Sequence, residues 1–147
     1  MAPPRPPRSR RAARKRALDV LYEADLRDRS IPAVLAGHLD PDADDPLPDF
    51  TVALVRGVHR HREELDGLIS ATAKDWTLSR MPLVDRNLAR MAIFEILHDP
   101  EVPTAVAINE AVDLAKELST DDSGRFLNGL LGRIASQQAQ PVPPAPA

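Results

Sequence analysis

The first 16 residues of the chain carry seven basic side chains and no acidic one: Arg5, Arg8, Arg10, Arg11, Arg14, Lys15 and Arg16. The whole 147-residue chain has a net charge of −3, so the remaining 131 residues together carry −10 once the +7 of this segment is removed. Guanidinium and ammonium groups concentrated at one end of an acidic chain are typical of a segment that meets a polyanion, most often nucleic acid. We therefore predict a nucleic-acid-binding end and an acidic body that repels the same ligand.

The four histidines raise the question of a metal site. His59 and Glu63 are four residues apart and share a face if this segment is helical, whereas His61 is expected to point away, with no third ligand nearby. His98 is explained by its place near a helix C-terminus. We predict a solvated polar face here, with no metal and no cofactor. The chain also lacks cysteine, a phosphate-binding glycine loop and a Ser/His/Asp arrangement, so we predict that it is not an enzyme.

Apolar residues recur at helical spacing between the two ends, and no segment alternates long enough to predict a strand. Ser9 and Ser30 are placed to cap helices, and Thr104 and one of Asp121, Asp122 or Ser123 are expected to cap later ones. The helices are expected at about 10–28, 31–39, 49–74, 83–98, 105–118 and 122–136. The predicted fold class is all-α, with about six or seven helices.

The most apolar segment, 91–97, is hydrophobic nearly all round, which predicts a central helix buried on every side. Glu95 lies inside this segment. Because a buried carboxylate needs a partner, we expect Glu95 to tie two helices together.

Composition divides the chain into three parts. Residues 1–8 and 138–147 are rich in proline and are predicted to be disordered tails, the first of them basic. Residues 9–137 form the predicted helical domain. No apolar run is long enough for a transmembrane helix, so no membrane association is expected, and the absence of cysteine fits a cytoplasmic protein.

The last third of the chain strongly resembles the NusB family of bacterial transcription antitermination factors. The resemblance rests on Val102-Pro103, on the segments 107–116 and 126–131, and on Asp122-Ser123 between them. The arginine-rich opening and the segment 88–96 agree with it, so that it covers about residues 9–136. It implies two small helical bundles around the central helix.

The resemblance also implies a function. NusB proteins bind boxA, a short single-stranded RNA element in ribosomal RNA leader transcripts, together with the ribosomal protein NusE. With other Nus factors they keep RNA polymerase elongating. On this basis, two residues are expected to face NusE, Tyr22 and Asp85. The residues expected to bind RNA are Arg10, Arg11, Arg14, Lys15, Tyr22, Asp122, Phe126 and Asn128.

Physical chemistry leaves some of these roles open. The basic side chains can neutralise phosphates, while Tyr22 or Phe126 offers a ring for stacking and Asp122 and Asn128 offer polar groups for base edges. Phe126 can equally be a core residue, and Asp122 only a helix cap.

Two other functions agree less well with the sequence. A NusB-like domain also forms the N-terminal part of ribosomal RNA cytosine methyltransferases, but the chain shows no cofactor-binding glycine motif and no catalytic cysteine. A helix-turn-helix DNA-binding protein would carry its basic residues on a recognition helix and not at the N-terminus.

Overall fold

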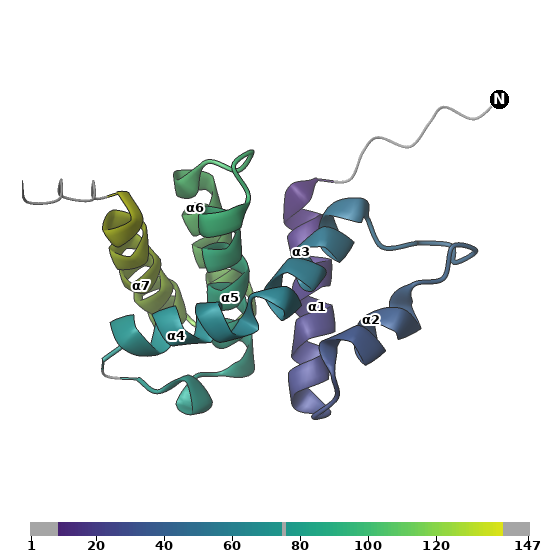
Figure 1. The fold of residues 1–147 in the computed structure, drawn as a ribbon, viewed down its shortest axis with the longest axis horizontal. Helices are drawn as coiled ribbons and strands as arrows, with labels where there is room; N and C mark the ends of the chain where they lie inside the picture. Colours follow the sequence, from purple (N-terminus) through teal and green to yellow (C-terminus); the bar gives the residue numbers. More distant parts are fainter. Residues whose placement is uncertain (1–8, 75, 140–147) are drawn as a thin grey trace, which may run out of the picture.

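The computed structural model describes residues 9–74 and 76–139, and within them the chain forms seven α-helices, a 3₁₀ turn and no strand (Figure 1). This confirms the predicted all-α fold. The helices are α1 (Arg10–Leu26), α2 (Ile31–His38), α3 (Asp49–Arg60), α4 (Arg62–Thr72), α5 (Leu83–His98), α6 (Thr104–Leu118) and α7 (Asp121–Ala139), with the 3₁₀ turn η1 (Leu78–Arg80) before α5.

The helix boundaries agree with the sequence in most places. The hydroxyls of Ser9 and Ser30 accept hydrogen bonds from the amides of Ala12 and Ala33, both at 3.2 Å, and so cap α1 and α2 as predicted. The expected caps of the last two helices were wrong. Helix α6 begins at Thr104 itself, without a side-chain cap, and near α7 the Oγ1 of Thr120 accepts from the amide of Ser123 at 3.0 Å.

The predicted tails lie largely outside the part of the chain that the structure describes. Residues 1–8 and 140–147 are beyond the described residues. At the C-terminal end the boundary expected at 137 is too early, because α7 continues to Ala139.

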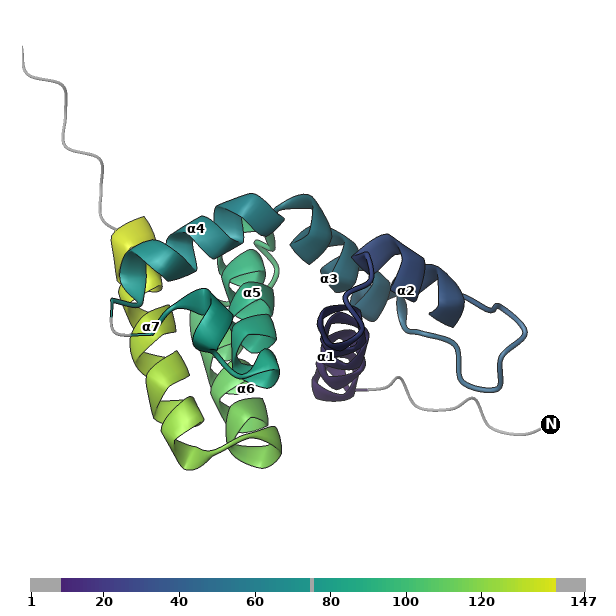
Figure 2. The ribbon, with the colours of Figure 1, turned by 90° about the horizontal axis from the view of Figure 1, so that it is seen from below.

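The helices form two groups on either side of α5. Helices α1, α2 and α3 pack together, and α4, α6 and α7 pack around α5 (Figures 1 and 2). Helix α5 contacts both groups, since it packs against α1, α3, α4, α6 and α7. Its residues Leu88, Ala89, Met91, Ala92 and Ile93 are all buried. The prediction of a central buried helix is therefore confirmed.

One predicted helix is divided in the structure. The expected helix 49–74 consists of α3 and α4, which meet at His61 with φ −104° and ψ 16° and differ in direction (Figure 2). Helical hydrogen bonds continue across the joint, because the His61 amide donates to the Gly57 carbonyl at 3.0 Å and the Leu65 amide to the His61 carbonyl at 2.9 Å. Both helices contact α5, and the direction changes because α3 also packs on α1 and α2, whereas α4 also packs on α7. Hydrophobic periodicity alone does not show this change of partner.

A buried arginine joins three helices at the centre. Arg90 of α5 donates from Nη1 to Asp25 Oδ2 of α1 at 3.2 Å and from Nε to Asp66 Oδ1 of α4 at 2.7 Å. Burial by itself would raise the pKa of Asp25, but a hydrogen bond from Asn87 and the positive charges of Arg90 and Arg86 outweigh it and hold that pKa below its usual value. Asp25 is therefore a charged anchor between α1 and α5.

Candidate nucleic-acid interface

The N-terminal half of α1 presents its cations beside α6. Arg11 donates from Nε to Glu110 Oε2 at 2.7 Å and from Nη2 to Asp113 Oδ2 at 2.8 Å. Lys15 Nζ donates to Glu117 Oε1 at 3.0 Å. The side chains of Arg11 and Lys15 remain 47% and 45% exposed. Both cations are thus accessible to a ligand while they hold carboxylates of another helix.

The carboxylates form a stripe that the sequence analysis did not identify, which we call the α6 acidic stripe: Glu110, Asp113 and Glu117. Their spacing of three and four residues puts them on one helix face. That spacing is visible in the sequence, but the pairing is not, because Arg11 is 99 residues from Glu110 and Lys15 is 102 residues from Glu117. Only the packing of the two helix groups brings the stripe beside α1.

The neighbouring basic residues are held differently. The guanidinium of Arg10 lies 4.9 Å from the centre of the Phe50 ring, a cation–π distance. Arg16 donates to the backbone carbonyls of Asp45 and Pro46, at 2.9 and 3.0 Å, in the loop after α2. Arg11 and Lys15 are therefore the cations of α1 that contact the α6 acidic stripe. Arg10 directly precedes Arg11 in the chain and contacts Phe50 instead.

Arg14 is buried, whereas its expected RNA-binding role requires an exposed side chain. It is only 4% exposed, and its Nε and Nη2 donate to the two carboxylate oxygens of Glu95 at 2.8 and 2.7 Å. Burial alone would lower the pKa of Arg14, but the hydrogen bonds and charge of Glu95 raise it above its usual value. We correct the expected RNA-binding role of Arg14 to a structural one, because its donors are turned inward and satisfied. The prediction that Glu95 ties two helices together is confirmed.

Asp85 is also placed in the interior. It is fully buried at the start of α5, where its Oδ2 accepts a hydrogen bond from Ser123 Oγ of α7 at 2.6 Å. The expected position on a partner-facing surface is therefore corrected, since a fully buried carboxylate touches no partner in this conformation. Its role is to join the first turns of α5 and α7.

The other expected residues lie on the surface or at its edge. Tyr22 on α1 is 37% exposed. At the start of α7 the exposed Asp122 pairs with Arg125, and the Phe126 ring packs edge-on against Trp76 at 4.9 Å between ring centres. Asn128 is exposed but lies about 200° around the helix from Phe126, at 100° per residue. Asp122 and Phe126 therefore share one face of α7, and Asn128 lies on another.

These residues form two regions along α5. Helix α1 runs antiparallel to α5, because Arg14 pairs with Glu95 and Asp25 with Asn87. Glu95 follows Asn87 by eight positions, which corresponds to about 12 Å along the helix. The basic half of α1 is at the C-terminal end of α5, whereas Tyr22 and the start of α7 are near its N-terminal end. A ligand that contacts both regions must be extended.

The fold and this surface define a small all-helical protein with exposed basic residues on one helix at its edge. The NusB family model matches residues 11–136, and the chain belongs to the NusB family. The transcription antitermination protein NusB of Salinispora arenicola is 58% identical over 130 residues, which cover 86% of this chain and 95% of the relative. This agrees with the prediction of a non-enzymatic transcription factor.

Solved structures agree with this family. The structure of T. maritima NusB is similar with a TM-score of 0.80 and 34% identity, covering 90% of this chain and 94% of that one. A chain in the crystal structure of antitermination factors NusB and NusE in complex with dsRNA gives a TM-score of 0.71 at 27% identity, covering 87% and 96%. Among the described residues, no helix has the length and apolar character needed to span a membrane.

Proposed function

We propose that this chain is an RNA-binding transcription antitermination factor that recognises boxA in ribosomal RNA leader transcripts together with NusE. In this proposal it acts in the cytoplasm with other Nus factors and supports processive elongation by RNA polymerase. The names of its relatives support the antitermination role. The similar chain that forms a complex with NusE and dsRNA supports the two binding partners.

The observation that carries the proposal is the exposed row of cations on α1. Arg11 and Lys15 are held by carboxylates of which Asp113 and Glu117 are half-exposed and Glu110 is partly exposed, and water screens ion pairs of this kind so that they contribute little to stability. A phosphate offers an arginine the same two-oxygen geometry as a carboxylate. RNA phosphates can therefore replace the α6 acidic stripe at little cost, and Arg10 adds a third cation at the same end.

Recognition of the RNA sequence is then assigned to the region that contains Tyr22 and the start of α7. Phosphate contacts position an RNA but do not read its bases. Tyr22 has an exposed ring, whereas Phe126 is already packed against Trp76, so Tyr22 is the better stacking surface. Asp122 and Asn128 supply polar groups on α7, and we propose that Tyr22 also borders the NusE-binding surface.

Removing three cations of α1 is expected to weaken RNA binding without selectivity. In Arg10→Ala/Arg11→Ala/Lys15→Ala, the slope of log K against log salt should fall by about 2, because each phosphate of a single strand that the protein neutralises adds about 0.7 to that slope. Fluorescence anisotropy with boxA RNA and a scrambled RNA of equal length, with and without NusE, measures this. Both RNAs should weaken by the same factor.

The control removes two exposed arginines just beyond the other end of α1, the C-cap Arg27 and Arg29, in Arg27→Ala/Arg29→Ala. This variant should keep most of the affinity. Equal losses in the two variants would mean that α1 acts only through net charge, and an unchanged slope in the triple variant would refute the proposed phosphate contacts. A wild-type protein that binds boxA no better than scrambled RNA, even with NusE, would refute boxA recognition.

Neutralising the α6 acidic stripe is expected to strengthen RNA binding. In Glu110→Gln/Asp113→Asn/Glu117→Gln the cations of α1 no longer have to leave carboxylates, and at about 0.2–1 kcal/mol for each exposed pair the affinity should rise several-fold to tenfold or more. The control Asp28→Asn/Asp44→Asn/Glu63→Gln makes the same change in net charge at exposed positions elsewhere. If the control raises the affinity as much, the stripe does not compete with RNA for these cations.

A further inference from the structure

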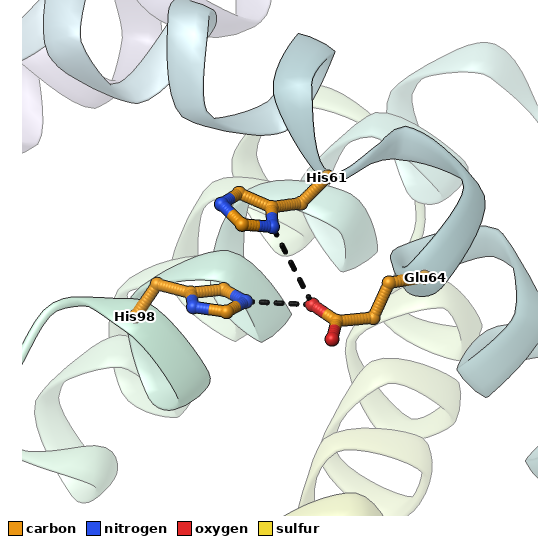
Figure 3. Close-up of side chains that lie close together, drawn as sticks. All are labelled: His61, Glu64 and His98. Atoms are coloured by element: carbon orange, nitrogen blue, oxygen red, sulfur yellow. Dashed lines mark hydrogen bonds and ion pairs between the residues drawn. The ribbon is translucent and has the colours of Figure 1, made fainter.

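Three potential metal ligands meet where the chain passes from one helix group to the other. His61 forms the joint between α3 and α4, Glu64 lies in the first turn of α4, and His98 is the last residue of α5. His98 Nε2 is 2.6 Å and His61 Nδ1 is 3.7 Å from the same Glu64 oxygen, and the three ligand atoms all lie within 4.8 Å of one another. Figure 3 shows the two imidazole rings and the carboxylate converging on one point.

The donor set suits a borderline transition metal. Two imidazole nitrogens and one carboxylate oxygen are the protein ligands of many Zn²⁺ sites, which bind the ion at about 2.0–2.2 Å and leave a fourth position for water. Tetrahedral bonds of that length separate the donors by about 3.3–3.5 Å. The two distances to Glu64, 2.6 and 3.7 Å, lie on either side of this value, and the Glu64 side chain is half-exposed and has room to adjust.

The surroundings hold the two imidazoles close together. Their rings stack at 3.9 Å between centres with an interplanar angle of 19°, so one ring must turn out of the stack before a single ion can lie in the planes of both. The Phe94 ring contacts both, with centres 5.8 Å from His61 and 5.6 Å from His98, and rests directly on Gly57, where a Cβ would lie 2.1 Å from the ring. A substituent at residue 57 would displace Phe94 and with it both histidines.

An ion can reach the cluster from solvent. A surface cavity of about 630 Å³ borders it and is lined by His61 and Glu64 among other residues. Both histidine side chains are about 30% exposed. A divalent ion bound there would neutralise the Glu64 carboxylate and be held by both rings in their neutral form.

We propose that His61, Glu64 and His98 form a Zn²⁺ site. A bound ion would link the α3–α4 joint to the C-terminal end of α5 and so stiffen the connection between the two helix groups. The sequence suggested a different pair, His59 and Glu63, and expected no metal. The relevant set appears only when α5 packs against the start of α4.

Isothermal titration of metal-free, untagged full-length protein with ZnCl₂ at pH 7.5 tests the site. We expect one Zn²⁺ per chain with a micromolar Kd, and a rise in Tm that EDTA reverses. His98→Asn and Glu64→Gln should each weaken binding at least tenfold, while His59→Ala and His38→Ala, which remove exposed histidines outside the cluster, should bind as the wild type does. Titration with Co²⁺ should give the visible absorption of a tetrahedral site.

The proposal fails if the wild type takes up no Zn²⁺ at 100 μM. It also fails if His59→Ala or His38→Ala reduces binding as much as His98→Asn, since the ion would then be held by surface histidines in general. Circular dichroism and Tm in EDTA establish that each variant is folded.

Discussion

Replacing Arg14 with alanine is expected to lower the free energy of unfolding by about 3–5 kcal/mol, the usual cost of leaving one partner of a buried ion pair alone. Glu95 is only 2% exposed, and both of its oxygens accept hydrogen bonds from Arg14. Without the guanidinium, an unpaired carboxylate remains inside the buried apolar segment of α5. Urea unfolding followed by circular dichroism at pH 7 measures the loss.

Two comparisons separate this structural role from a role in RNA binding. Arg11→Ala removes the same group three residues earlier but from an exposed pair, and it should lower the free energy of unfolding far less than Arg14→Ala does. Replacing both buried partners, in Arg14→Met/Glu95→Leu, should restore most of the stability, because no buried charge is left unpaired. At a temperature where Arg14→Ala is folded, its affinity for RNA should match that of the wild type. Normal stability with weakened RNA binding would return Arg14 to the RNA-contacting residues.

Replacing Arg90 with alanine is the second large effect that we expect, at about 3 kcal/mol of unfolding free energy. Arg90 is 2% exposed and donates to Asp25 and Asp66, which lie on two different helices. The cost stays at the lower end of the range because both carboxylates keep another arginine: Asp25 contacts Arg86, and Asp66 contacts Arg62. Arg90→Lys keeps the charge but cannot reach both carboxylates with the same geometry, so it should lie between alanine and the wild type.

The pH dependence of the stability of Arg90→Ala tests whether Arg90 acts through its charge. The pKa of Asp25 in the folded protein is held below its unfolded value of about 3.9. Its contribution is therefore fully present above pH 3.9 and is lost as the pH falls through the folded pKa. The difference in stability between the wild type and Arg90→Ala should narrow below about pH 4. A difference that stays constant from pH 7 to pH 3 would mean that Arg90 acts through packing of its side chain and not through its charge.

Local features of the sequence were sufficient to predict the all-α fold, most of the helix boundaries and the central buried helix. The caps at Ser9 and Ser30 act within three residues, and the burial of α5 follows from an apolar segment without a polar face. Glu95 was correctly expected to be paired because a charge inside such a segment has no other stable state. Motifs in the last third of the chain were specific enough to indicate the family.

The environment of each charged side chain was decided by tertiary packing. Arg11 and Arg14 differ by only about 60° around α1, yet one faces the α6 acidic stripe at the surface and the other is buried against α5. The division between α3 and α4 and the meeting of His61 with His98 depend likewise on segments that are distant in the sequence. Periodicity and spacing describe one helix at a time, whereas burial and pairing depend on which other helix covers each face.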